Sequence, residues 1–88
     1  MKYRVVLARQ PRNYLARLGR DQEARILTRL HELESDPYAP PNTKALEGRP
    51  GLRSARVGDW RIVYRPDEAN GIVRVVVIAP RGEVYRLI

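Results

Sequence analysis

The stretch "SARVGDWRIVYR", residues 54–65, predicts a β-hairpin that turns at Gly58 and Asp59. A two-residue type II′ turn needs positive φ at its first central position, which glycine supplies. This turn fixes the register of the two strands, in which the facing pairs are Val57 and Trp60, Arg56 and Arg61, Ala55 and Ile62, and Ser54 and Val63. The hairpin decides the fold, because it predicts antiparallel strands in the second half of the chain.

The alternation of side chains gives this hairpin two unlike faces. One face is predicted to join the core and carries Ala55, Val57, Trp60, Ile62 and Tyr64. The other is predicted to be cationic and carries Ser54, Arg56, Arg61, Val63 and Arg65. Arginines directly across a strand pair have Cβ atoms about 4.5 to 5.5 Å apart and destabilise it. A bound anion would offset this repulsion; alternatively, the arginines extend into water or pair with Glu47 or Glu83.

The N-terminal half predicts one strand followed by two helices. Residues 2–7 alternate, with Tyr3, Val5 and Leu7 on one face. Residues 8–18 have helical spacing and end at Gly19. Residues 21–35 form a second helix that ends before Pro37, with an apolar stripe of Ile26, Leu27, Leu30 and Leu33.

Proline and glycine punctuate residues 36–51, which predict an irregular connection that docks Leu46 on the core. Strand patterns follow at 53–57, 60–65 and 72–79, and a last short segment covers 83–88. We therefore predict an α+β fold with an N-terminal strand, a two-helix hairpin and an antiparallel meander of three to four strands, with the helices packed on one face. Residues 1–88 are expected to form a single domain.

The composition narrows the classes of function. The 88 residues include no cysteine and one histidine, so we expect no disulfide, no metal site and no cofactor. The apolar run at 75–79 is too short to span a bilayer, and the first twelve residues lack the apolar core of a signal peptide. We expect a soluble, cytoplasmic protein that does not engage a membrane.

The net charge of +7 predicts a polyanionic partner, either nucleic acid or an acidic protein. Fifteen of the seventeen basic residues are arginine, whose planar fork binds phosphate with two parallel hydrogen bonds. A GC-rich genome would also favour arginine over lysine, but it would not explain the excess of positive charge.

The C-terminal stretch "IAPRGEVYRLI" brings further candidates to the hairpin. If residues 72–79 pair beside the second hairpin strand, the turn after Ala79 delivers Arg81 and Tyr85 to the rim of the cationic face. An aromatic ring beside arginines can stack on a base next to a bound phosphate. The alternative is that Tyr85 and Leu87 close the edge of the core.

The hairpin, with "PRGEVYR" about twenty residues later, resembles the RelE/ParE superfamily of bacterial toxins from type II toxin–antitoxin pairs. The likeness also covers "YRVVLARQPRNYLARL", "LESDPY" and "KALEG", in the order that the family has. Many members carry a histidine before the arginine of the last motif, where this chain has Pro80.

The resemblance implies a cytoplasmic toxin that cuts messenger RNA on the ribosome, or alternatively a ParE-like inhibitor of DNA gyrase. A nucleic-acid-binding module without catalysis is the third reading. The implied catalytic residues are Arg61, Arg81 and Tyr85, with RNA or phosphate contacts from Arg56 and Arg53. We predict further RNA or phosphate contacts from Arg65 and Lys44. Glu83 is a weaker candidate for the base. The implied partners are a cognate antitoxin, the ribosome and messenger RNA.

Overall fold

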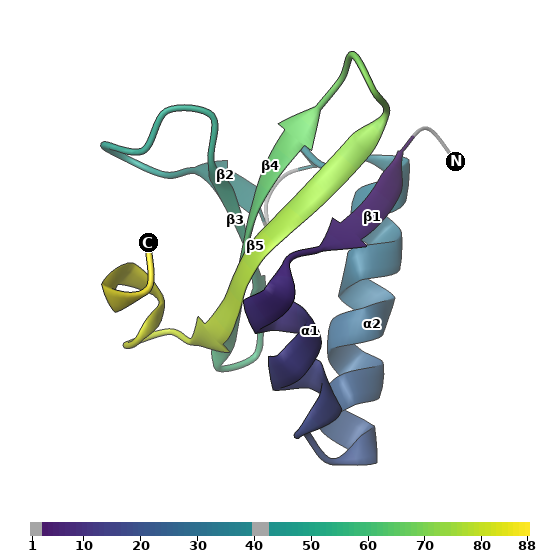
Figure 1. The fold of residues 1–88 in the computed structure, drawn as a ribbon, viewed down its shortest axis with the longest axis vertical. Helices are drawn as coiled ribbons and strands as arrows, with labels where there is room; N and C mark the ends of the chain where they lie inside the picture. The colour runs from purple at the N-terminus through teal and green to yellow at the C-terminus, as the bar shows by residue number, and fades with distance from the viewer. Residues whose placement is uncertain (1–2, 40–42) are drawn as a thin grey trace.

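The computed structural model describes residues 3–39 and 43–88 (Figure 1). It has two α-helices, five β-strands and one short 3₁₀ helix. In chain order these are β1 (Arg4–Leu7), α1 (Arg9–Ala16), α2 (Arg20–Ser35), β2 (Thr43–Ala45), β3 (Arg53–Val57), β4 (Trp60–Asp67), β5 (Ile72–Pro80) and η1 (Val84–Arg86). None of the helices in these two ranges is long and apolar enough to cross a membrane.

The strands form one mixed sheet in the order β1-β5-β4-β3-β2. Strands β2 to β5 are an antiparallel meander, and β1 pairs with β5 in parallel. The predicted α+β fold is confirmed. The prediction for residues 36–51 was wrong in one respect, because β2 lies inside this connection and pairs with β3.

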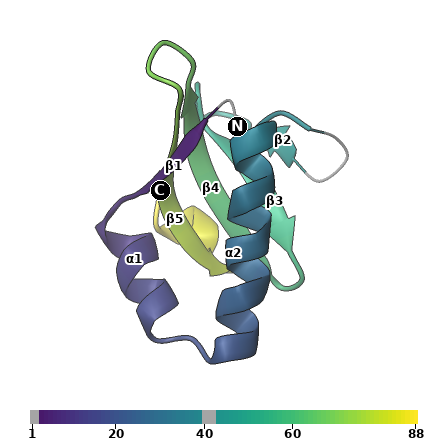
Figure 2. The ribbon, with the colours of Figure 1, turned by 90° about the vertical axis from the view of Figure 1, so that its right-hand side faces the viewer.

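Both helices cover one face of the sheet, and η1 lies on the opposite face (Figures 1 and 2). The helix-covered core is made by α1, α2 and the central strands; its fully buried side chains include Ile26, Leu33, Ile62, Tyr64, Val73, Val75 and Ile78. Tyr3, Val5 and Leu7 pack against this core, as the alternation predicts. The predicted stripe on α2 was too wide, since Leu27 is 47% exposed.

The predicted register of the hairpin is confirmed at all four pairs. Gly58 has a φ of +54°, and no non-glycine residue in the described part of the chain has positive φ. The turn therefore has the backbone signature of type II′, with the left-handed position at glycine.

The hairpin face opposite the helices is only partly cationic. Ser54 and Val63, which were predicted to lie on a charged face, are fully buried. A second apolar cluster covers them on this side, built from Leu46, Val63, Val77, Ala79 and Val84. A register shift between Val63 and Tyr64, which leaves Val76 without a partner in β4, divides the valines of β5 between the two faces.

Candidate active site

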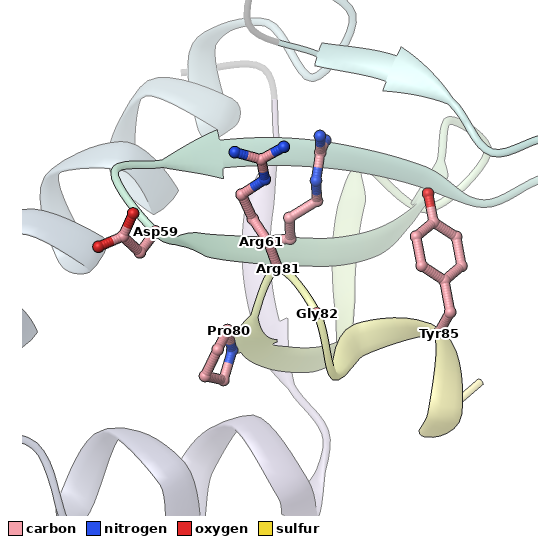
Figure 3. Close-up of a pocket in the computed structure, with 6 residues that line it drawn as sticks. All are labelled: Asp59, Arg61, Pro80, Arg81, Gly82 and Tyr85. Carbon is pink, nitrogen blue, oxygen red and sulfur yellow. The ribbon is translucent and has the colours of Figure 1, made fainter.

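An open pocket of about 540 Å³ lies where the hairpin turn meets the loop after β5. Figure 3 shows its lining, which consists of Asp59, Arg61, Pro80, Arg81, Gly82 and Tyr85. The guanidinium groups of Arg61 and Arg81 extend to the same side, and the Tyr85 hydroxyl points in that direction too (Figure 3). The three residues predicted to be catalytic therefore line one pocket.

The paired ends of β4 and β5 bring the two arginines together. Trp60 faces Pro80 and Arg61 faces Ala79, so Arg81 emerges just beyond the last pair of the ladder. The Arg81 backbone N–H donates to the Asp59 carbonyl at 2.9 Å, which ties the loop to the hairpin turn. Proline at position 80 has no N–H to continue a ladder, and Glu83 N–H donates back to its carbonyl at 2.9 Å.

Arg61 reaches across the neighbouring strand β3. Its NH1 donates to the hydroxyl of the buried Ser54 at 3.3 Å. Arg56 faces Arg61 across the ladder but folds back, so that its Nε donates to the Gly58 carbonyl at 3.3 Å. The two guanidinium groups thus diverge, and Arg56 stands outside the lining of the pocket.

Tyr85 is held in place by its neighbour in η1. Val84 is fully buried in the second apolar cluster, whereas the Tyr85 side chain is 52% exposed. A 3₁₀ turn with one anchored residue therefore presents an aromatic ring at the pocket rim. This corrects the alternative in which Tyr85 and Leu87 close the core, since Leu87 is also exposed.

The carboxylates near the pocket leave the paired arginines unneutralised. Glu83 forms an ion pair with Arg86 at 3.7 Å and does not line the pocket. Asp59 lines it, but its carboxylate points away from both guanidinium groups (Figure 3). Within residues 3–39 and 43–88, neither Arg61 nor Arg81 has an acidic side chain within ion-pair distance. The pocket can accordingly bind an anion such as phosphate.

The remaining predicted phosphate contacts separate into two groups. Lys44 faces Ser54 in the β2–β3 ladder and is exposed, so it lies on the same sheet face as Arg61. Arg65 is exposed, but its NH1 lies 3.4 Å from the Pro50 carbonyl, outside the pocket. Arg53 is not brought to the site, because it faces Tyr64 in the ladder and shares the helix-covered side with it.

Arg53 has its own partners on that side. Its NH2 donates to the Thr43 hydroxyl at 3.0 Å, and its guanidinium lies 5.1 Å from the centre of the Tyr38 ring. Burial raises the pKa of the nearby Tyr64, although Arg53 and Thr43 act in the opposite direction. The Tyr64 hydroxyl donates to the Pro37 carbonyl. The Arg53 side chain therefore contributes to the packing of the helix-covered side and not to the pocket.

Comparison with known families identifies the fold. Residues 6–85 match the model of the ParE toxin of the type II toxin–antitoxin system parDE. The chain belongs to this toxin family. A curated Toxin RelE from Mycobacterium tuberculosis is 46% identical over 37 residues, which are 42% of this chain and 38% of that protein. The match thus spans well under half the length of that relative.

Solved structures of RelE toxins resemble this toxin over nearly its whole length. The RelE–RelB complex from Pyrococcus horikoshii OT3 matches with a TM-score of 0.80 and 29% identity, covering 93% of this chain and 98% of that one. The toxin–antitoxin complex RelBE2 from M. tuberculosis matches with a TM-score of 0.79 and 25% identity, covering 92% and 100%. The chain is therefore a RelE-like toxin of the RelE/ParE superfamily.

Sequence reasoning missed several residues that shape the pocket of this toxin. It treated Asp59 only as a turn residue and placed Ser54 on an exposed face. The Ser54 hydroxyl holds Arg61, and the Asp59 carbonyl holds Arg81. Ser54 pairs with apolar Val63, and this pair of small or apolar residues could have indicated that this part of the face is buried.

Proposed function

We propose that this toxin is an endonuclease that cuts messenger RNA on the ribosome. The 2′-hydroxyl would give up its proton and attack the adjacent phosphate, forming a 2′,3′-cyclic phosphate as the bond to the 5′-oxygen breaks and that oxygen takes a proton. The observation that carries the proposal is a pair of arginines, Arg61 and Arg81, that have no acidic partner in the described part of the chain and share one open pocket with an exposed tyrosine.

Each side chain has a distinct task in this reaction. Arg61, held by Ser54, binds the phosphate and stabilises the negative charge of the phosphorane. Arg81 approaches from the loop and screens or protonates the leaving 5′-oxygen. Tyr85 stacks on a base or exchanges a proton at the reacting group. Arg56 and Lys44 extend the positive surface along the RNA backbone.

Dependence on the ribosome follows from what the pocket offers. Its side chains supply charge stabilisation, while its carboxylate points away from the arginines (Figure 3). Such a site gives little help in removing the 2′-hydroxyl proton unless the substrate is already held in line for attack. The ribosome can provide that orientation, so we expect slow cleavage of free RNA.

The test is induced expression followed by primer extension on a reporter transcript. Wild-type toxin is expected to produce in-frame cuts, and Arg61→Ala to reduce them by about a hundredfold or more, as loss of one charge-stabilising donor does. Arg74→Ala is the matched control, because it removes an exposed arginine from β5 outside the pocket. Equal cutting by wild type and Arg61→Ala would remove Arg61 from the mechanism.

The match to the ParE family model favours a second candidate, inhibition of DNA gyrase. In that case the positive face would contact gyrase or its DNA, and no transcript would be cut. Gyrase-dependent DNA cleavage, assayed beside primer extension, separates the two functions. Stabilised DNA breaks with intact transcripts would select the gyrase function.

We further propose that a cognate antitoxin binds this chain. Support comes from the two similar structures, which are toxin–antitoxin complexes, and from the charge of +7, which suits an acidic segment. Such a segment would lie on the cationic face, on the helices or along an exposed strand edge. Co-expression with a neighbouring reading frame, followed by co-purification and loss of toxicity, tests this partner.

A further inference from the structure

Helix α1 makes two polar contacts with the sheet, through side chains one turn apart. The Gln10 amide donates from Nε2 to the Ile78 carbonyl at 2.8 Å, and its Oε1 accepts from the Ile78 N–H at 2.9 Å. The Tyr14 hydroxyl accepts from the Trp60 indole N–H at 2.9 Å. Residues i and i+4 share one face of a helix, so the two contacts form a pair.

The Gln10 side chain makes the hydrogen bonds to the Ile78 backbone that a neighbouring strand would otherwise make. Strand β1 ends at Leu7, opposite Val75, and the Ala8 N–H makes the last backbone bond to the Val75 carbonyl at 2.9 Å. Beyond this point no strand of residues 3–39 or 43–88 lies beside this edge of β5, yet Ile78 is fully buried. One carboxamide offers both a donor and an acceptor, as a strand residue would. Gln10 thus satisfies a backbone edge that would otherwise be buried unpaired.

Both contacts act at the end of the ladder that carries the pocket. Ile78 faces Ile62, and Trp60 faces Pro80, so the anchored residues lie on two rungs of the β4–β5 ladder with a single rung between them. Arg61 lies between the two anchored rungs on β4, and Arg81 follows Pro80 directly. Trp60 and Ile78 pack in the helix-covered core, whereas Arg61 lies between Trp60 and Ile62 on β4 and so has its side chain on the opposite face. The Arg81 guanidinium extends to the same side as that of Arg61 (Figure 3).

We propose that Gln10 and Tyr14 are positioning residues that set the spacing of Arg61 and Arg81 through the backbone of β4 and β5. Neither touches the pocket, so neither is a catalytic residue. The effect on RNA cleavage rests on the proposed function, whereas the effect on the arginines does not. The rival explanation is that the two contacts only add stability, as the buried Leu15 on the same helix does.

The test compares variants that remove these bonds with a matched loss of stability elsewhere. Gln10→Glu keeps an acceptor for the Ile78 N–H but loses the donor to its carbonyl, and Tyr14→Phe removes only the hydroxyl. Ile26→Val trims a buried residue of α2 that takes part in neither contact. Arg12→Ala changes an exposed position on α1 and controls for the charge of that helix.

The first readout is independent of any activity. In amide hydrogen exchange, we expect the Ile78 N–H to exchange roughly fivefold faster in Gln10→Glu, because the carboxylate oxygen that replaces Nε2 repels the Ile78 carbonyl and weakens the whole contact. In ¹H–¹⁵N spectra, the Nε–H signals of Arg61 and Arg81 are expected to shift in Gln10→Glu and in Tyr14→Phe but not in Ile26→Val or Arg12→Ala. Unmoved arginine signals in both anchor variants would overturn the proposal, and Tyr14→Phe carries the test if Gln10→Glu does not fold.

The second readout is ribosome-dependent cleavage. Because a misplaced arginine weakens stabilisation of the transition state more than binding, kcat should fall about tenfold or more in the anchor variants with KM little changed. Full activity in both variants, at a stability equal to that of Ile26→Val, would overturn the catalytic part. If the arginine signals shift while the wild type cuts no RNA, positioning by α1 stands and the proposed nuclease function fails.

Discussion

The two faces of the sheet differ in what covers them and in what they leave open. Helices α1 and α2 close one face over a continuous core, whereas η1 covers only part of the other with a smaller apolar cluster. Arg61, Arg81 and Tyr85 lie beside that smaller cluster, at the end of the β4–β5 ladder. The comparison suggests that the helix face carries most of the folding free energy, and that the other face can hold unpaired positive charge because little depends on its packing.

The largest effect is expected from a cavity in the helix-covered core. Leu33→Ala removes a fully buried side chain of α2 and should lower the free energy of unfolding by about 2 to 5 kcal/mol. Urea denaturation measures this loss. The matched control is Leu27→Ala on the same helix, where the side chain is 47% exposed and the change should stay within about 0.5 kcal/mol. Similar losses in the two variants would refute the division of α2 into a buried and an exposed side.

A smaller effect is expected on the opposite face. Val84→Ala removes two methyl groups from the second cluster and should cost about 1.5 to 2 kcal/mol, mostly by loosening η1. Because Val84 anchors the turn that carries Tyr85, the rate of the proposed RNA cleavage should fall even under conditions where Val84→Ala is still fully folded. Leu87→Ala, at an exposed position three residues on, serves as the control for both measurements. If Val84→Ala leaves Tyr85 as ordered as in the wild type, this anchoring argument fails.

The sequence predicted the register of the hairpin but not the second apolar cluster on the face opposite the helices. Turn chemistry is local, so Gly58 and Asp59 were enough to predict the register that places Arg61 opposite Arg56. The apolar run at 75–79 has no alternation, and only the register shift at Val76 decides which valines face the helices. The second cluster therefore could not be foreseen.

The candidate site also has a part that the sequence predicted and a part that it could not reveal. Pairing of the last two strands was sufficient to bring Arg81 toward Arg61, and the family resemblance pointed to Tyr85. Alternation alone would have placed Arg53 beside Ala55 on the helix-covered side, where the structure has it. The contact between Gln10 and Ile78 joins residues 68 positions apart, which no local pattern could reveal.

A third variant tests the polar part of the helix-covered face. Tyr64→Phe removes the hydroxyl that donates to the Pro37 carbonyl and should cost about 1 kcal/mol at pH 7. Burial raises the pKa of Tyr64, so the folded state favours the neutral phenol. The wild type should therefore lose stability as the pH rises above about 10 and approaches the folded-state pKa. Tyr64→Phe should lose less, because only Tyr3 and Tyr38 keep a raised pKa there.

Urea denaturation at pH 7 and at intervals up to pH 11 measures both effects of Tyr64→Phe. The advantage of the wild type should shrink as the pH rises. Tyr85→Phe is the control at pH 7, because this exposed tyrosine on the other face should leave the unfolding curve unchanged. A constant difference between wild type and Tyr64→Phe up to pH 11 would contradict the assignment to burial.

The smallest effect is expected at the β4–β5 turn, which belongs to neither apolar cluster. The Asn70 side chain donates to Asp67 at 2.9 Å and its backbone N–H donates at 3.2 Å, and these bonds, the side-chain bond above all, lower the pKa of Asp67. A lowered pKa adds stability that is present above the ordinary value of about 3.9 and is lost as the pH falls through the folded-state value. Asn70→Ala should raise the pKa of Asp67 only part of the way, since the backbone donor remains. Carboxyl chemical shifts followed by NMR between pH 2 and pH 7 measure this change, and an unchanged pKa would show that the Asn70 side chain does not stabilise the ionised carboxylate.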